Sequence, residues 1–439
     1  MSVLLKNIVL ILFFASVFHG GDLYAQDSLY HDLPKTWNLK DCIDYAKKNN
    51  ISINSLKLSS KTAEQSLIAA KAAKYPNLSA NVTQDVSHYN SGTQSSSGYG
   101  VSSGITLFNG GYLNNDVKSK TLSEQVANLS VNAAENDITL QITQAYLNIL
   151  LSKENIAYLN DLLSTSNALV KQGTQRLTAG TIAKKDLLQL QATMANDNYT
   201  LITAQNQLQQ NVLTLKQLLQ LPTRIGFDVV AADTTKVNEH LIDLASAQDQ
   251  ALRTRPEVKG AELNVQLQNT ELEKARATIR PVLSLNGSLG SGYNSTSFGN
   301  YPNQLNNTFN QALGLTLSIP IFDRKVTKTN VAKANIEIQQ ARLSLLDTKT
   351  TLTQSVEKAY LNVQNANSQY QAAKEQFNYT SEALRISEAE LKLGSSSIVD
   401  YLQQKNLYVQ ALQAFVQAKY TANLYTKIYD FYTGVPITE

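Results

Sequence analysis

The side chains that most often perform chemistry are scarce in this chain and are not grouped. Its 439 residues include four histidines and one cysteine. A general base, a nucleophile or a metal site needs such groups held together at a set spacing. The histidines are scattered at His19, His31, His88 and His240, and Cys42 has no second cysteine with which to form a disulfide or a CxxC motif. We therefore predict that the chain is not an enzyme and has no cofactor and no metal site.

Carboxylates recur at matching places after two glycines. Asp186 follows Gly180 by six residues, and Asp400 follows Gly394 by the same interval. In the simplest interpretation each glycine ends a helix in the left-handed conformation, and Asp400 is a solvated acid after the turn. The overall charge is nearly neutral, because 38 basic and 35 acidic residues give +3. This balance predicts no nucleic-acid partner.

The first residues have the composition of an export signal. Lys6 gives a positive start, residues 8–18 form an apolar core, and Leu23-Tyr24-Ala25 is a small-residue cleavage site. We predict a signal peptide over residues 1–25. The alternative, a membrane anchor, needs about 20 apolar residues, which is more than this core offers. Later runs are shorter still, so insertion into a bilayer would have to use strands.

The remainder of the chain is duplicated. A shift of 214 residues aligns the segment Ala-Tyr-Leu-Asn at 145–148 with the same four residues at 359–362. The register is constant over more than 100 residues, which is strong evidence for a repeat. Further aligned pairs are Phe108 with Phe322, Gly180 with Gly394, Asp186 with Asp400, and Pro222 with Pro436. Upstream the shift is 205, so nine additional residues are expected in the stretch 294–311.

Two windows without proline predict very long helices. An apolar seam with coiled-coil spacing runs through Ile138, Ile142, Ala145, Ile149, Ile156, Leu159 and Leu163. At about 1.5 Å per residue, residues 112–173 would span about 90 Å and residues 324–393 about 100 Å. Helices of this length must project as a rod or a tube. A dimeric coiled coil with a structural role is the alternative, but it leaves the strands unexplained.

Four segments alternate between apolar and small polar residues, as strands do. They are residues 78–87 and 99–107 in the first copy, and residues 283–289 and 313–321 in the second. This alternation fits a half-buried soluble sheet or a barrel with lipid outside and water inside. Four strands are too few to close a barrel, and an open edge is untenable in lipid. Three chains would supply twelve strands and resolve the problem.

The signal, the duplication, the paired strands and the long helices together resemble the TolC-like outer-membrane efflux protein family. The resemblance extends over residues 36–436. Three motifs carry it: Trp37-Asn38-Leu39-Lys40-Asp41-Cys42-Ile43 at the start, and the strand-to-helix junctions Leu107-Phe108-Asn109-Gly110-Gly111 and Ile319-Pro320-Ile321-Phe322-Asp323.

The resemblance implies an α+β membrane protein in the outer membrane of a Gram-negative cell. The expected homotrimer has a twelve-stranded β-barrel continued by a long α-helical coiled-coil tunnel in the periplasm. Each chain would contain a first repeat (36–222), an equatorial segment (223–242) and a second repeat (243–436). Short helices at 52–73 and 255–278 would stack end to end with the helices after the glycine turns. Residues 227–239 would lie in a girdle around mid-tunnel.

The implied function is an exit duct of a tripartite efflux or type I secretion system. Its partners would be a periplasmic adaptor (membrane fusion) protein, an inner-membrane RND or ABC transporter, and the lipid of the outer membrane. A non-conducting periplasmic or surface coiled-coil scaffold is the alternative from a different functional class. Ion conductance separates the two hypotheses, because only the duct has a pore.

The resemblance also assigns roles at the two helix turns, which would be the periplasmic tips. The adaptor-docking residues would be Arg176, Leu177, Gly180, Lys392, Leu393 and Gly394. Gate residues would be Asp400, Gln403 and Asp186, and three copies of Asp400 around an axis would favour cations. The alternative role for Asp400 is that of a solvated acid. The tyrosine and arginine that latch the closed state in the family correspond to Leu391 and Ser396 here, so packing is expected to hold the tips instead.

Overall fold

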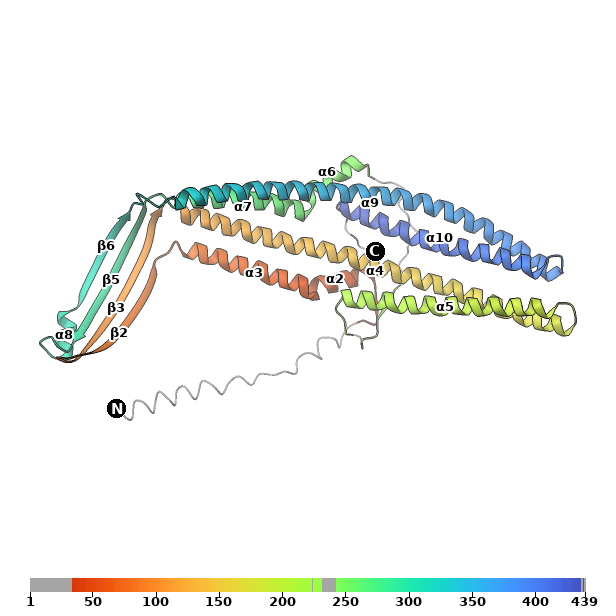
Figure 1. Cartoon of the computed structure of the whole chain (residues 1–439), viewed down its shortest axis with the longest axis horizontal. Helices are drawn as coiled ribbons and strands as arrows, with labels where there is room; N and C mark the ends of the chain where they lie inside the picture. Colours follow the sequence, from red (N-terminus) through yellow and green to blue (C-terminus); the bar gives the residue numbers. More distant parts are fainter. Residues whose placement is uncertain (1–33, 223, 231–241, 436, 438–439) are drawn as a thin grey trace, which may run out of the picture.

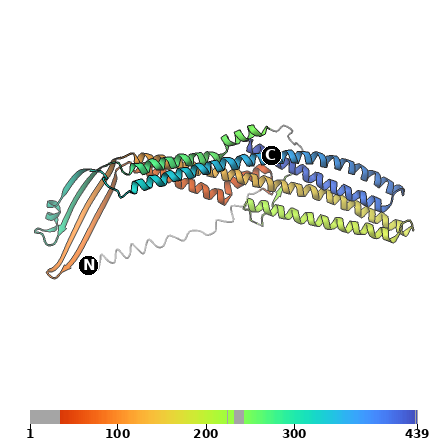
Figure 2. The same ribbon diagram turned by 45° about the horizontal axis from the view of Figure 1, so that its top comes forward.

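The molecule is long and narrow, with a β-sheet at one end and two helical hairpins at the other (Figure 1). The computed structural model describes residues 34–222, 224–230, 242–435 and 437. The predicted signal peptide, residues 1–25, lies outside the described residues. Turning the molecule by 45° (Figure 2) shows that the sheet leaves the helical part at an angle in both views.

The two halves of the chain repeat one order of elements. The first half contains β1 (Thr36–Trp37), α2 (Leu39–Asn49), α3 (Ile51–Ala72), β2 (Asn77–Tyr89), β3 (Gly92–Asn109), α4 (Tyr112–Thr178) and α5 (Lys184–Leu218). The second contains β4 (Asp228–Val229), α6 (Leu244–Thr254), α7 (Pro256–Ala277), β5 (Val282–Asn294), α8 (Tyr301–Asn307), β6 (Asn310–Ser318), α9 (Val326–Leu393) and α10 (Ile398–Tyr432). Residues 90–91 connect β2 to β3, whereas residues 295–309 connect β5 to β6, which confirms the place of the extra residues. The three boundaries given above for the repeats and the equatorial segment stay predictions.

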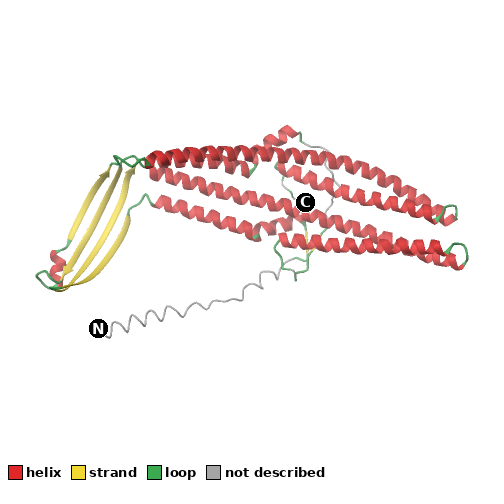
Figure 3. Ribbon diagram, viewed as in Figure 1, coloured by secondary structure: helices red, strands yellow, loops and turns green. Residues whose placement is uncertain are grey.

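The long helices form two antiparallel hairpins, α4 with α5 and α9 with α10 (Figure 3). The helix α4 has 67 residues and α9 has 68, so each is roughly 100 Å long. The predicted seam on α4 is confirmed, since Ile142, Ala145, Ile149 and Leu159 are buried. No helix in the described part of the chain combines the length and the apolar character needed to cross a membrane.

The shorter helices continue the hairpins end to end, as predicted. Where α5 ends and α3 begins, the backbone N–H of Ile51 donates to Gln220 Oε1 at 2.9 Å. Where α10 ends and α7 begins, the Arg255 guanidinium lies over the rings of Phe431 and Tyr432, at 4.7 and 5.2 Å from their centroids. Each junction therefore joins two helices into one continuous rod.

The four long strands form one antiparallel sheet in the order β2-β3-β5-β6. The strand pairing places the predicted apolar residues on one face, since Val101 is opposite Leu289 and Leu285 is opposite Leu315.

One detail of the predicted alternation in residues 99–107 is wrong. A β-bulge between Thr106 and Phe108 interrupts the alternation, and Phe108 rather than Leu107 pairs with Leu283.

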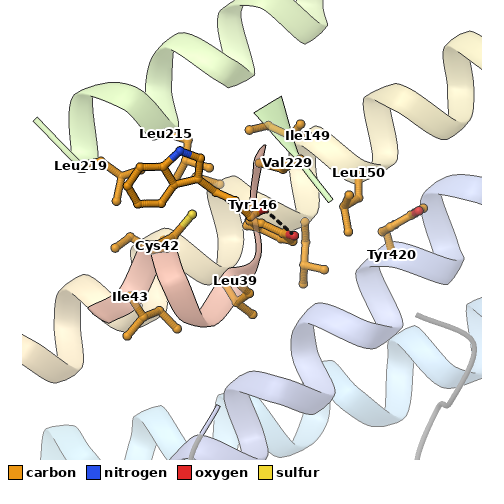
Figure 4. Packing of buried hydrophobic residues seen from close by; sticks show 14 of the residues in the cluster. Leu39, Cys42, Ile43, Tyr146, Ile149, Leu150, Leu215, Leu219, Val229 and Tyr420 are labelled. Carbon is orange, nitrogen blue, oxygen red and sulfur yellow. Dashed lines mark hydrogen bonds between the residues drawn. The ribbon is translucent and has the colours of Figure 1, made fainter. Parts of the chain in front are cut away.

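The largest apolar cluster lies at the middle of the molecule, where α2, α4, α5 and α10 meet (Figure 4). The Tyr146 hydroxyl donates to the Val230 carbonyl at 2.6 Å and lies 3.3 Å from that of Trp37. Cys42 is fully buried on α2, and burial raises the pKa of its thiol to about 12. The short parallel pair β1–β4, which the sequence did not predict, ties residues 36–37 to 228–229. The described residues of the predicted girdle, 227–230, thus pack at the middle of the molecule.

Candidate functional site

Two tight turns lie together at the end of the molecule farthest from the sheet (Figures 1 and 3). Gly180 has a φ of 73° and Gly394 a φ of 76°, so both are left-handed. A Cβ at either position would meet nothing within 4 Å, and it is therefore the backbone conformation that favours glycine. The interpretation of both glycines as helix caps is confirmed.

Each predicted gate carboxylate takes part in the cap at the start of its helix. Asp186 Oδ2 accepts the backbone N–H of Ala183 at 3.3 Å. The Ser397 hydroxyl donates to Asp400 Oδ2 at 2.7 Å, and the backbone N–H of Asp400 donates back to that hydroxyl at 3.1 Å. An acid in the first helical turn also complements the helix dipole. Asp400 and Gln403 are exposed one turn apart on α10, and Asp186 is half-buried on α5. Their role as a gate stays a prediction.

The predicted docking residues form a mixed apolar and basic surface. Arg176 Nη2 donates to the Leu391 carbonyl at 3.4 Å, which links the tip of α4 to the tip of α9. Lys392 is exposed and pairs with Glu388 at 3.1 Å. Leu393 is 84% exposed, so an apolar side chain faces water at the very tip. Leu177 lies half-buried beside Arg176 in sequence.

An apolar cluster behind the turns holds the two hairpins together. It consists of Leu169 from α4, Leu190 from α5, Leu391 from α9, and Tyr401 and Leu402 from α10. Leu391 is thus a core residue of this cluster. Burial, with a smaller effect from nearby carboxylates, raises the pKa of Tyr401 to about 12, so its hydroxyl stays protonated at neutral pH.

A buried ion pair behind this cluster was not predicted. Lys405 Nζ on α10 lies 2.7 Å from Asp197 Oδ2 on α5, and the two side chains are 2% and 9% exposed. The Ser166 hydroxyl on α4 donates to the same carboxylate oxygen at 2.5 Å and also contacts Lys405 Nζ. The triad therefore bridges the two hairpins through three helices.

The apolar periodicity contained a signal for this pair. On α5, Asp197 continues the 3-4 spacing of Leu187, Leu190, Met194 and Leu201. On α10, Lys405 continues the spacing of Leu402, Val409, Leu412 and Val416. A single charge of opposite sign at a core position of each helix predicts that the two charges meet, because a buried charge needs a partner.

At the other end of the molecule, the polar face of the sheet lines an open hollow of about 740 Å³. Its lining includes Ser102, Gly104, Thr106, Asn286 and Gly314, which are small and uncharged. Across the described residues, no three His, Cys, Asp or Glu side chains gather as metal ligands.

Asp430, in the last turn of α10, is a half-buried carboxylate with a perturbed pKa. Burial raises its pKa above 3.8, and the nearby Lys427 lowers it by less. Because the folded chain then binds more protons than the unfolded chain, stability falls as the pH rises from 3.8 through the folded pKa.

We expect Asp430→Asn to raise the thermal midpoint at pH 7. The gain should disappear below about pH 3.8, where both states are protonated; a gain that persists at pH 3 would refute this cause.

Comparison with known proteins gives a family and several relatives. The family model described as outer membrane efflux protein matches residues 42–220 and again residues 247–424. The outer membrane protein TolC of Escherichia coli (strain K12) is 23% identical over 318 residues, which are 69% of this chain and 63% of that protein. Toxin and drug export protein A of Aggregatibacter actinomycetemcomitans is 23% identical over 272 residues, which are 60% of this chain and 58% of that protein. The chain thus spans less than two thirds of the length of these two relatives.

Solved structures share the fold over most of their length. The Campylobacter jejuni CmeC outer membrane channel superimposes with a TM-score of 0.78 at 18% identity, covering 90% of this chain and 86% of that one. The open state of the Neisseria gonorrhoeae MtrE outer membrane channel gives a TM-score of 0.76 at 19% identity, covering 90% and 88%. At these identities the likeness establishes the fold.

Proposed function

The chain belongs to the outer membrane efflux protein family, and from this premise we propose that it is the exit duct of a tripartite efflux or type I secretion system. It is an outer-membrane efflux channel with a tunnel in the periplasm, and its family consists of channels rather than enzymes. The proposal adds that three chains close one twelve-stranded barrel. It also adds that solutes enter from an inner-membrane transporter, of the RND or ABC type, through a periplasmic adaptor.

The observation that carries the proposal is the two-faced sheet with two unpaired edges. Its apolar face is open to the surroundings in a single chain, with Leu78 at 78% and Leu313 at 79% exposure. Its other face is the polar hollow, and among the described residues β2 and β6 have no neighbouring strand on their outer sides. An apolar outer face suits lipid, and edges in lipid must be paired. Pairing β6 of one chain with β2 of the next satisfies both requirements.

Partners are proposed from the opposite end of the molecule. The exposed Leu393 with the basic Arg176 and Lys392 gives the tips an apolar and basic surface. A helical-hairpin adaptor with complementary acidic and apolar residues would fit it. The names of the relatives include toxin, drug and pyoverdine export, and we propose export as the general process without a particular cargo.

The decisive experiment measures ion conductance of the purified full-length chain in planar bilayers. We expect heat-modifiable trimers on gel electrophoresis and discrete conductance steps after insertion. A protein that stays outside the bilayer and conducts no ions would contradict the duct and favour the coiled-coil scaffold.

The proposed gate makes a separate prediction. Asp400→Ala should lower the cation selectivity of the channel, because it removes three negative charges from the narrowest ring. Reversal potentials across a salt gradient measure this selectivity. Asp400→Asn removes the same charge with a side chain that can still accept a hydrogen bond, so both variants should shift the potential alike. Unchanged reversal potentials would leave Asp400 with its capping role alone.

A further inference from the structure

Two consecutive basic residues occupy an unfavourable backbone conformation where the sheet passes into α9 (Figure 1). Arg324 has a φ of 54° and Lys325 a φ of 67°. The left-handed region is costly for residues that carry a Cβ, and residues held there cluster at functional positions. The chain therefore tolerates strain at this junction, and the duplication allows its purpose to be examined.

The first half of the chain builds the same turn from glycine. At the equivalent positions, 214 residues earlier, Gly110 and Gly111 have φ of 66° and 89°. Asn109 Oδ1 and Asp323 Oδ2 each accept a hydrogen bond from the backbone N–H four residues later, at 3.3 and 2.8 Å. Because two glycines make this turn without strain, the turn itself does not require the two cations.

The side chains of the two cations are exposed and form no ion pair with an acid in the described part of the chain. Arg324, Lys325 and Lys328 are all exposed, and none of them takes part in an ion pair among the described residues. The neighbouring acid is Asp323, whose carboxylate accepts the backbone N–H groups of Lys325 and Thr327 at 3.0 and 2.8 Å. This acid already occupies the N-terminus of α9, so a ligand here would be held by the basic side chains.

The cations adjoin the apolar face of the sheet. Ile319 and Ile321 extend the outward residues of β6 toward α9, and they are 58% and 95% exposed. Lys71 and Lys74 precede β2 at the same end of the sheet, on its opposite edge. In a closed ring, β6 of one chain would meet β2 of the next, which would extend the basic residues into a collar below the apolar band.

We propose that Arg324 and Lys325 bind the phosphate of anionic phospholipid headgroups in the leaflet that faces the periplasm. The inference rests on the proposed function, because it requires the sheet to lie in the outer membrane. Charge complementarity and continuity with the apolar band identify a lipid, since its acyl chains would cover the band while its phosphate meets the cations. Each basic residue near an anionic membrane surface contributes roughly fivefold in affinity, so the pair contributes about 25-fold.

The test titrates the detergent-solubilised full-length protein with dioctanoyl-phosphatidylglycerol and counts bound lipid by native mass spectrometry. Two variants remove the cations: R324G/K325G copies the glycines of the first half and relieves the strain, and R324Q/K325Q keeps side chains at both positions. Both should bind phosphatidylglycerol about 25-fold more weakly at low salt. Equal affinities for wild type and R324Q/K325Q would overturn the proposal.

Three controls define the ligand and the site. Dioctanoyl-phosphatidylcholine, with the same chains and no net charge, should bind weakly and equally to all variants. Inorganic phosphate should not displace the lipid; displacement at equal concentration would overturn the assignment to a lipid in favour of a free anion. The variant K358Q/K374Q, which removes two exposed lysines farther along α9, should bind phosphatidylglycerol like the wild type.

Conductance separates this inference from the proposed function. All variants are expected to form conducting trimers, because the exchanged residues lie outside the strands and the tips. If the wild type does not conduct, the duct hypothesis fails. If it conducts and its binding of phosphatidylglycerol does not depend on Arg324 and Lys325, the lipid inference alone fails.

Discussion

Replacing Asp197 by alanine is expected to destabilise the tip half of the hairpins by about 3–5 kcal/mol. The substitution leaves the Lys405 ammonium buried at 2% exposure without its counter-ion, and removes one of two acceptors within reach of the Ser166 hydroxyl. Repositioning a lysine that sits between three helices requires the two hairpins to separate locally. Native-state hydrogen exchange measures this local opening, and amides at the start of α10 should exchange roughly 100- to 4,000-fold faster.

A double variant distinguishes a charge effect from a loss of packing. Asp197→Leu with Lys405→Leu replaces the pair by apolar side chains of similar size, and this change is often neutral or stabilising at such sites. We therefore expect hydrogen exchange near the wild-type rate in the double variant.

Glu388→Ala is the exposed counterpart, since it breaks the Glu388–Lys392 pair at the surface of α9. It should change stability by less than about 0.5 kcal/mol. If Asp197→Ala and Glu388→Ala lowered the stability by similar amounts, burial would not be the reason that the Asp197–Lys405 pair matters.

Local patterns predicted most of the architecture because the repeats and the periodicities are local properties of the chain. Helix lengths followed from windows without proline, and the left-handed turns followed from Gly180 and Gly394. The bulge at Leu107 was missed because an alternating pattern contains no sign that a strand has one residue more than its partner at that point. The β1–β4 pair was missed for a related reason, since two-residue strands are too short to show any period.

The candidate site was predictable in position but not in its interactions. The matching of Asp186 with Asp400 located both tips, yet their capping hydrogen bonds depend on backbone geometry. The pair between Lys405 and Asp197 joins residues that are 208 positions apart, and only the docking of one hairpin on the other brings them together. Single-helix periodicity reports which face is buried and is silent about which helix covers it.

The second large effect is expected at mid-tunnel, where Trp37→Ala should cost about 3–5 kcal/mol. The indole is 2% exposed and packs edge-on against Tyr45 at 5.2 Å and beside Phe227 at 5.8 Å between ring centroids. Its Nε1 has no hydrogen-bond partner among the described residues. The cost therefore arises from the cavity and the lost contacts rather than from a lost hydrogen bond. The thermal midpoint, followed by circular dichroism, measures the loss.

Trp37→Phe is the matched control, because it keeps an aromatic ring and removes the unpaired donor. Phenylalanine leaves a smaller cavity than alanine does, and removing the unpaired donor offsets part of the free-energy cost of that cavity. We therefore expect less than half of the loss of stability seen with alanine.

The position also couples two distant segments, since the backbone of Trp37 pairs with Val229 and its carbonyl lies beside the Tyr146 hydroxyl. Trypsin should therefore cleave Trp37→Ala faster within residues 224–230, after Arg224, than it cleaves the wild type. Equal cleavage rates with a lowered midpoint would show that the indole stabilises the helices α2 and α5 without holding the strand pair in place.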